Sequence, residues 1–373
     1  MKKVRLGDVA TFVNGYAFKP TDWKENGKEI IRIQNLTKSN KDTNFYDGEI
    51  NEKYKVVKGD ILISWSATLG IYIWQRDDAW LNQHIFKVIF DKLNIDKKYF
   101  VFVIQYILDD LKSQVHGATM KHITKGKFDN TLIPFPSLIE QKAIAAKLDK
   151  AQEVIRYTEE IIANYDALTQ SLFLDMFGDP VKNEKRWEKR ELNEFGIWKS
   201  GGTPLRSIEK YYTGRIPWVS SGELNEIFIH TSKEFITEEA IQNSAAKIIE
   251  KGSILLGMYD TAALKSSINT EEITCNQAIA FSKLDDKKVN SLFVYFSIQY
   301  GKEFYKSQQR GVRQKNMNLT MIKELEINYP PIALQNQFAE RVAIIEAQKQ
   351  QVQESLAKSQ DLFNSLLQES FKN

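Results

Sequence analysis

The sequence has very little cysteine and no long apolar run, and both absences exclude classes of protein. Cys275 is the only cysteine, so neither an internal disulfide nor a cysteine-cluster metal site can form. No stretch of about eighteen apolar residues occurs, so no membrane-spanning helix is expected. The start Met1-Lys2-Lys3-Val4 does not have the pattern of a signal peptide. We therefore expect a cytoplasmic protein that makes no contact with a membrane.

Motifs that mark common enzymes are also missing. There is no glycine-lysine loop to cradle a phosphate and no glycine-rich dinucleotide fingerprint. The four histidines, His84, His116, His122 and His230, lack metal-ligand spacing. The Asn-Pro-Pro-Tyr or Asp-Pro-Pro-Tyr order of amino methyltransferases is absent, because Asn328-Tyr329-Pro330-Pro331 has a different order. These absences favour a binding protein without a metal, and an enzyme with an unrecognised motif is the alternative.

What the chain does contain is an internal duplication. Residues recur at one constant offset: Pro136, Leu138, Gln141, Leu168, Ser171, Leu172 and Phe177 match Pro330, Ile332, Gln335, Leu362, Ser365, Leu366 and Phe371. Upstream, Asn82-Gln83 matches Asn276-Gln277 at the same offset. So long a period indicates two copies of a domain and helix, rather than a solenoid of short units.

Each copy is predicted to end in a long helix with an apolar seam, because its seam residues follow alternating steps of four and three. The first seam is Ile144, Leu148, Ala151, Ile155, Thr158, Ile162, Tyr165, Thr169, Leu172 and Met176. The second is Phe338, Val342, Ile345, Lys349, Val352, Leu356, Ser359, Phe363 and Leu366. Ser137 and Glu140 are expected to form a capping box at the start of the first helix, and Gly178-Asp179-Pro180 is expected to end it. At ~1.5 Å per residue each helix is about 60 Å long.

These signals predict an α+β protein with two mixed α/β heads, each followed by a spacer helix. The expected bounds are 1–137 and 179–331 for the heads, and 138–178 and 332–373 for the helices. The simplest pairing is an antiparallel coiled coil of the two helices with pseudo-twofold symmetry, and parallel homodimerisation through each helix uses the same pattern.

The net charge is only +3, and the heads hold the positive charge. That distribution fits basic heads on neutral spacers, and equally fits ordinary surface charge.

The order of several short blocks resembles a known family. The blocks are Gly59-Asp60-Ile61-Leu62, Leu81-Asn82-Gln83-His84, the run from Pro136 to Gln141, and Phe177-Gly178-Asp179-Pro180 followed by Trp187 and Leu192. Together with the duplication they resemble, over essentially the whole chain, the specificity subunit of a type I restriction-modification system.

The resemblance implies a DNA-reading subunit without catalysis. Each head would be a target recognition domain that reads one part of a split site on double-stranded DNA. The helices would set the distance between the heads and present a surface to two methyltransferase subunits, and two motor and nuclease subunits would complete the restriction enzyme. S-adenosylmethionine, ATP and Mg would be used by those partners and not by this chain. The rivals are a coiled-coil protein-protein scaffold with duplicated heads and no DNA role, and the recognition part of a fused restriction enzyme.

Candidate DNA contacts are polar loops at matching places in the two copies, since Lys and Arg bind phosphates and polar side chains read base edges. The coincident Lys121 and Lys315 suit a shared phosphate contact, whereas Trp65 suits the core equally well. The candidates are Arg32, Gln34, Asn35, Ser64, Trp65, Ser66, Thr68, Lys121, His122, Trp218, Ser220, Ser221, Tyr259, Arg313, Gln314, Lys315 and Asn316. Asn82-Gln83 and Asn276-Gln277 are predicted to be structural turns.

Outside the shared blocks the two copies differ, as in residues 18–23 against 204–209. We therefore predict an asymmetric bipartite target with an unread gap. Helix length should set that gap, because shortening both helices by four residues removes ~6 Å, or about two base pairs at ~3.4 Å each.

Overall fold

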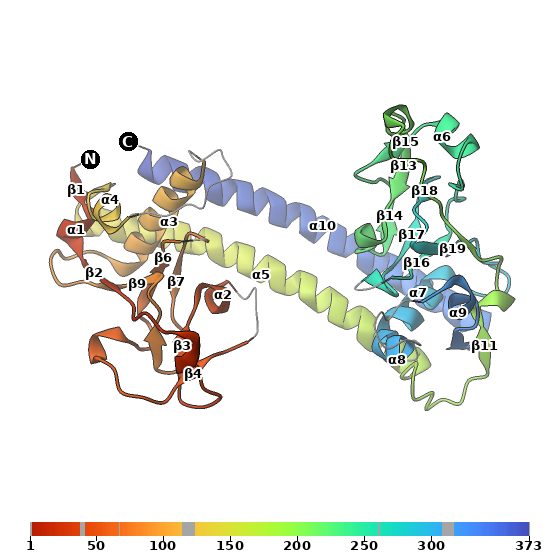
Figure 1. Cartoon of the computed structure of the whole chain (residues 1–373), viewed down its shortest axis with the longest axis horizontal. Coiled ribbons are helices and arrows are strands. Elements are labelled where there is room, and N and C mark those ends of the chain that lie inside the picture. The colour runs from red at the N-terminus through yellow and green to blue at the C-terminus, as the bar shows by residue number, and fades with distance from the viewer. Residues whose placement is uncertain are drawn as a thin grey trace. The chain divides into compact units, whose positions relative to one another are not determined.

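The computed structural model of the chain describes residues 2–37, 42–66, 68–113, 124–259, 262–307 and 317–372. It divides into two compact units, unit 1 (Met1–Glu159 with Glu354–Asn373) and unit 2 (Glu160–Gln353). Each unit combines one head with a segment of each long helix, α5 (Leu138–Phe177) and α10 (Ile332–Phe371) (Figure 1). The boundary between the units falls within both long helices, and the helices themselves begin at Leu138 and Ile332, where the sequence predicted them to begin.

Unit 1 is built from three sheets and short helices. Its strands are β1 (Lys3–Arg5), β2 (Thr11–Asn14), β3 (Lys28–Ile31), β4 (Phe45–Tyr46), β5 (Lys55–Val56), β6 (Ile61–Ser64), β7 (Gly70–Ile73), β8 (Ala79–Leu81), β9 (Ile85–Ile89) and β10 (Leu132–Pro134). Its helices besides α5 and α10 are α1 (Leu6–Val9), α2 (Ile33–Leu36), α3 (Lys97–Ser113) and α4 (Lys125–Asp129), with 3-10 turns η1 (Pro20–Asp22) and η2 (Glu52–Tyr54). The sheet orders are β2-β9-β6-β7, β4-β3-β8-β5 and β1-β10.

Unit 2 repeats this plan. Its strands are β11 (Lys189–Glu191), β12 (Lys199–Ser200), β13 (Ile216–Val219), β14 (Phe228–Ile229), β15 (Phe235–Ile236), β16 (Ile254–Gly257), β17 (Ser266–Asn269), β18 (Thr274–Cys275), β19 (Ile279–Ser282) and β20 (Glu326–Asn328). Its helices are α6 (Glu238–Gln242), α7 (Ser291–Tyr300), α8 (Lys302–Ser307) and α9 (Leu319–Lys323), with 3-10 turns η3 (Leu192–Glu194), η4 (Glu209–Tyr212) and η5 (Ser221–Glu223). The orders are β12-β19-β16-β17-β14, β15-β13-β18 and β11-β20.

In unit 1 the head and the long helices share one hydrophobic core. Helix α3 lies between them: Phe100 stacks on Phe12 of β2 with ring centroids 6.4 Å apart. Phe102 approaches Phe363 of α10 at 6.1 Å, on the other side. Because aromatic rings bury large apolar areas, these contacts join the helix pair firmly to the sheet.

Unit 2 has the same arrangement with α7 in the place of α3. Phe293 stacks on Phe173 of α5 at 6.0 Å, and Phe296 lies 5.5 Å from Phe338 of α10. Phe338 also meets Phe173 edge to face at 5.6 Å, so the two long helices and α7 share one aromatic cluster.

Within each unit the two long helices run antiparallel. In unit 1, Lys147 near the start of α5 lies 3.5 Å from Glu369 near the end of α10. In unit 2, Asp166 in the later half of α5 lies 2.5 Å from Lys349 in the earlier half of α10. Every residue of the two predicted seams is buried or half-buried, including Ile144, Leu148, Ile155, Ile162, Leu172, Phe338, Val342, Ile345, Val352, Leu356, Phe363 and Leu366.

The start of α5 has the predicted capping box. The backbone N–H of Ser137 donates to Glu140 Oε2 at 2.9 Å, and the N–H of Glu140 donates to Ser137 Oγ at 3.3 Å. The Ser137 hydroxyl and amide lower the pKa of the Glu140 carboxyl by hydrogen bonding to its charged form. None of the helices that the structure describes combines the length and apolarity needed to cross a membrane.

A buried glutamine ties each long helix to its head. Gln141 accepts a hydrogen bond from the N–H of Asp96 at 2.9 Å and donates to the carbonyl of Pro136 at 3.0 Å. Gln335 does the same with Asn290 at 2.9 Å and Pro330 at 2.8 Å. The repeated Pro and Gln of the sequence therefore form the same clamp in each unit. In this clamp the glutamine amide links the start of the long helix to the start of α3 or α7.

The repeated Asn-Gln pair forms a turn that is crossed closely by a glycine. The N–H of Gly15 donates to Ile85 and that of Gly201 to Ile279, both at the strand after the turn. A Cβ at Gly15 would lie 2.1 Å from the carbonyl oxygen of Asn82, and one at Gly201 would lie 2.4 Å from that of Asn276. Only glycine fits at this crossing, which confirms the structural reading of the pair.

We predict that Gly201→Ala lowers the free energy of unfolding of unit 2 by about 3 kcal/mol, because the added methyl overlaps backbone atoms that cannot rotate away. Hydrogen exchange of amides in β16 and β19 measures this loss. Gly222→Ala is the matched control, since a Cβ there meets no atom within 4 Å. Equal exchange in the two variants would contradict the close crossing.

Candidate nucleic-acid interface

Two loops of each unit meet at the Asn-Gln turn. In unit 2 the N–H of Asn276 donates to Val219 at the end of β13, and the N–H of Met258, after β16, donates to Ala278. In unit 1, β3 and β8 pair in parallel with Ile31 opposite Leu81, and the N–H of Trp65, after β6, donates to His84. Strand ends thus bring the loops that follow β3 and β6, or β13 and β16, to one edge of each head.

The loop after β6 contributes less surface than expected. Ser64 and Ser66 are buried, and the hydroxyl of Ser64 donates to the carbonyl of Thr68 at 2.5 Å. The structure therefore contradicts a DNA contact for Ser64 and Ser66, because both side chains are buried. Thr68 is exposed.

Trp65 is half-buried, and its side chain contacts both the core and the surface. Its ring stacks on Phe86 at 5.6 Å, and its indole N–H donates to Asn14 at 3.3 Å. The exposed imidazole of His84 lies 5.8 Å from the same ring. The Trp65 ring thus supports a small polar surface made of Asn14 and His84, which the sequence did not single out.

Arg32 and Asn35 are held by internal hydrogen bonds at the loop after β3. The guanidinium of Arg32 donates to Asn44 at 2.7 Å and lies 4.7 Å from the ring centroid of Trp23. Asn35 accepts from the N–H of Arg32 at 3.1 Å and donates to the carbonyl of Asp42 at 3.0 Å. A guanidinium has five donors, so Arg32 keeps donors for a further partner, whereas both ends of the Asn35 amide are engaged. Gln34 is half-buried on α2.

The counterpart loop in unit 2 corrects another expectation. Trp218 is only 4% exposed, and its indole N–H donates to the carbonyl of Gly202 at 3.0 Å, so it is a core residue and not a DNA contact. Ser220 donates through its hydroxyl to Glu223 at 2.7 Å. Burial opposes ionisation of Glu223, but hydrogen bonds from the amides of Ser220 and Lys233 outweigh it and lower the pKa of that carboxyl. Ser221 is half-buried at the start of η5.

Tyr259 is the exposed aromatic residue of the loop after β16. It is 37% exposed and follows Met258, whose carbonyl accepts a hydrogen bond from the N–H of Met317 at 2.8 Å. The remaining candidates, Lys121, His122, Arg313, Gln314, Lys315 and Asn316, lie outside the described residues.

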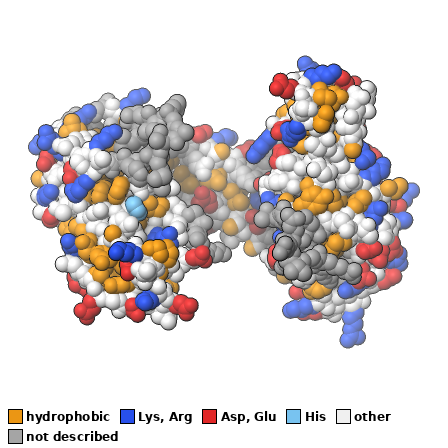
Figure 2. All heavy atoms as spheres, in the orientation of Figure 1, with side chains coloured by type: hydrophobic (Ala, Val, Ile, Leu, Met, Phe, Trp, Pro, Cys, Tyr) orange, Lys and Arg blue, Asp and Glu red, His pale blue; other side chains and the backbone are white. Residues whose placement is uncertain are grey.

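On the face that Figure 2 shows, charges of both signs are mixed over the described residues of each unit. One arginine near the turn of unit 2 has a stacked position: Arg206 lies 4.3 Å from the ring centroid of Tyr212 and 4.7 Å from that of Trp218. It also pairs with Glu234 at 2.7 Å, while about half of its side chain is exposed. Arg206 lies within residues 204–209, where the two copies differ, and no local sequence pattern predicts that its side chain is stacked.

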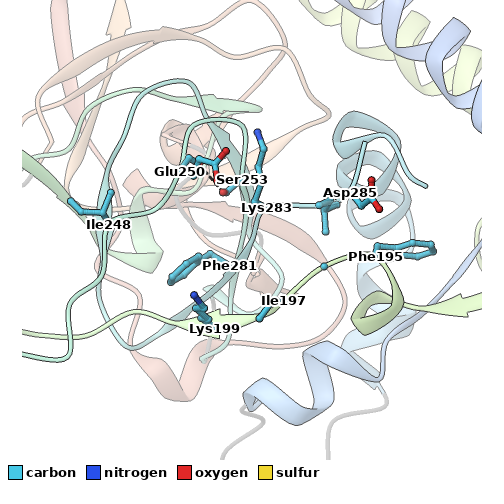
Figure 3. A pocket seen from close by; sticks show the side chains of 11 residues that line it. Phe195, Ile197, Lys199, Ile248, Glu250, Ser253, Phe281, Lys283 and Asp285 are labelled. Carbon is cyan, nitrogen blue, oxygen red and sulfur yellow. Dashed lines mark hydrogen bonds between the residues drawn. The ribbon is translucent and has the colours of Figure 1, made fainter. Parts of the chain in front are cut away.

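A concavity in unit 2 lies at the opposite end of β19 from the Asn-Gln turn. It has a volume of about 380 Å³ and includes Ile197, Lys199, Glu250, Phe281, Lys283 and Asp285 in its lining (Figure 3). The lining has two lysines, Lys199 and Lys283, and two acidic residues, Glu250 and Asp285, so the charges balance. Lys283 already donates to the carbonyl of Lys251 at 2.6 Å. In the described part of the chain, no group of three His, Cys, Asp or Glu side chains could hold a metal.

Comparisons with known proteins agree with this architecture. A family model described as "Type I restriction modification DNA specificity domain" matches residues 1–164 and 184–357. The specificity subunit of the type I restriction enzyme EcoBI from Escherichia coli is 24% identical, over 99% of this chain and 85% of the relative.

Two solved structures share the fold at low identity. The S subunit of a type I restriction-modification system from M. genitalium has a TM-score of 0.56 and 16% identity, covering 99% of this chain and 96% of that one. A chain from a structure on complex assembly and conformational transition of the type I R-M system has a TM-score of 0.57 and 17% identity, covering 99% and 97%. Because the family model covers both copies of the duplication, the chain belongs to the type I restriction-modification DNA specificity family.

Proposed function

We propose that this chain selects the DNA site of a type I restriction-modification complex by reading an asymmetric two-part sequence, one part with each head. Two methyltransferase subunits and two motor-nuclease subunits would assemble on it in the cytoplasm. S-adenosylmethionine, ATP and Mg would be bound by those partners, and the chain itself would supply recognition and scaffolding without catalysis.

One observation carries the proposal: the two heads repeat the same backbone crossing but surround it with different side chains. The loop after β6 in unit 1 has the half-buried Trp65 beside the exposed His84, whereas its counterpart in unit 2 has the buried Met258 followed by the exposed Tyr259. The exposed His84 of unit 1 corresponds to the buried Ala278 of unit 2. A repeated frame that displays different hydrogen-bonding groups suits two different base sequences, because base edges are distinguished by donor and acceptor pattern.

Co-expression with the cognate methyltransferase subunit in a host without DNA methylation should therefore yield one modified motif, with two unlike parts and a fixed gap. Mapping modified adenines across the genome measures this. Binding of the purified complex to that motif should weaken steeply with salt, because phosphate contacts release counterions. A palindromic motif would contradict the asymmetry, and a stable, active complex that methylates no motif would favour the protein scaffold.

We expect Tyr259→Ala to weaken binding to the cognate DNA about tenfold, since loss of one specific contact costs about 1–3 kcal/mol. Fluorescence anisotropy with a duplex that contains the mapped motif, and with a scrambled duplex, measures the change. Ile197→Ala is the control, because Ile197 is exposed (78%) and lines the concavity at the opposite end of β19 from the Asn-Gln turn. If both variants lose affinity equally, the turn is not the reading edge.

Helix length should fix the gap between the two parts of the target. Deleting residues 156–162 and 353–359 together removes one heptad from each long helix, keeps the seam in phase and spares the hydrophobic core of both heads. The helices then shorten by about 10 Å, or about three base pairs. The modified motif should keep both parts and lose about three base pairs of gap. An unchanged gap would refute this role for the helices.

A further inference from the structure

Arg206 of unit 2 is held by three neighbouring side chains although it lies at the surface. Its guanidinium carbon lies 4.3 Å from the ring centroid of Tyr212 and 4.7 Å from that of Trp218. One terminal nitrogen donates to Glu234 Oε2 at 2.7 Å. The side chain is nevertheless 54% exposed. An exposed arginine normally samples many rotamers, so contacts that fix its direction lower the entropy that binding of a ligand would cost.

The backbone that leads to Arg206 is anchored at the Asn-Gln turn. The N–H of Gly202 donates to the carbonyl of Cys275, directly before the turn, at 3.0 Å. The hydroxyl of Thr203 donates to Oε1 of Gln277, which belongs to the turn itself. The segment from Gly202 onward therefore leaves the turn with a fixed starting point.

The two rings that contact Arg206 also hold this segment. The indole N–H of Trp218 donates to the carbonyl of Gly202 at 3.0 Å, and the hydroxyl of Tyr212 donates to the carbonyl of Pro204 at 2.7 Å. Backbone and guanidinium thus depend on the same two aromatic side chains. The position of Arg206 relative to the turn is therefore set by the fold.

Most donors of the Arg206 guanidinium are free for a ligand. A guanidinium has five N–H donors, and Glu234 is its only hydrogen-bond partner among the described residues. The carboxylate of Glu234 would repel a phosphate that approached this pair, whereas the edge of a base carries no net charge. A planar fork of donors matches O6 and N7 of guanine in the major groove. These features favour contact with a base over contact with the DNA backbone.

Unit 1 has no arginine at the matching position. At the offset of 186 that joins Gly15 to Gly201, Pro20 stands in the place of Arg206. Any base that Arg206 contacts would therefore be read by one copy of the duplication and not by the other.

We propose that Arg206 reads a guanine in the part of the DNA target that unit 2 recognises, so that this inference rests on the proposed function. Its guanidinium donates to O6 and N7 of that guanine. Glu234 is a positioning residue, because its carboxylate holds one end of the fork and leaves the other end for the base.

Methylation directed by the full chain with its methyltransferase subunit tests the proposal. Arg206→Ala should accept other base pairs in place of one G·C pair in one part of the motif, and should keep the gap and the other part unchanged. In fluorescence anisotropy, the native complex should prefer the mapped motif about tenfold over a duplex with this pair replaced, which is the scale of one bidentate contact. Arg206→Ala should lose this preference. Glu234→Gln should lower it about threefold, because the fork loses a charged acceptor.

Arg190→Ala is the matched control. Arg190 lies 5.0 Å from the ring centroid of Tyr329 and 3.1 Å from Glu188, and its side chain is 38% exposed. It belongs to β11, and Tyr329 stacks on Phe195 in the lining of the concavity at the opposite end of β19 from the turn. Arg190→Ala should therefore leave the motif and the preference unchanged.

Arg206→Lys separates base reading from charge. It keeps the positive charge without the planar fork, so it should also lose most of the preference. Equal loss of affinity for every duplex in Arg206→Ala, restored by Arg206→Lys, would indicate a phosphate contact and overturn the proposal. An unrelaxed motif in Arg206→Ala, or a native motif without any G·C pair, would overturn it as well. Failure of the native complex to methylate any motif would instead count against the proposed function.

Discussion

The buried amides of Gln141 and Gln335 fix where each long helix begins. Each amide accepts from a backbone N–H of its own head and donates to the carbonyl of a proline just before the helix, so it is satisfied on both sides. Loss of either side chain would leave a buried N–H and a buried carbonyl unpaired, which costs about 1–3 kcal/mol per group. The direction in which the helix leaves its head therefore depends on this clamp. The seam contacts in each unit follow from it, because they need the correct helix face turned toward the partner helix.

The sequence predicted the parts of the structure that depend on local pattern. Four features could be predicted: the long helices, the seam, the capping box at Ser137 and the Asn-Gln turns. Each rests on periodicity or on hydrogen bonds between residues near in sequence. The sequence could not tell which polar or aromatic loop residues face inward. Trp218 is buried because a backbone segment sixteen residues away, at Gly202, comes within hydrogen-bonding distance. Ser64 is buried because the loop that follows it turns back, so that its hydroxyl reaches the carbonyls of Thr68 and Gly70. A serine or tryptophan in a loop carries no local mark of such an approach.

The two heads show how a duplicated frame can keep its geometry while its chemistry diverges. The crossing of Gly15 or Gly201 over the Asn-Gln turn allows no side chain, so both copies keep glycine there. The loops around the turn are held mainly by backbone hydrogen bonds, such as those from the N–H groups of Trp65 and Met258. Because these bonds do not depend on side-chain identity, the side chains at the same edge are free to change. That separation of backbone support from side-chain display is what a recognition protein with two different targets requires.

The ion pair of Lys349 and Asp166 also bears on how the helices choose their partners. Lys349 occupies a seam position, and a parallel homodimer through α10 would place it opposite Lys349 of the second copy. Two ammonium groups facing each other in a half-buried seam repel, and neither would have a carboxylate in register. In the antiparallel arrangement of unit 2, Asp166 of α5 lies 2.5 Å from this ammonium. One lysine in a mainly apolar seam therefore favours pairing of α10 with α5 of the same chain over pairing with a second α10, at the cost of a less apolar seam.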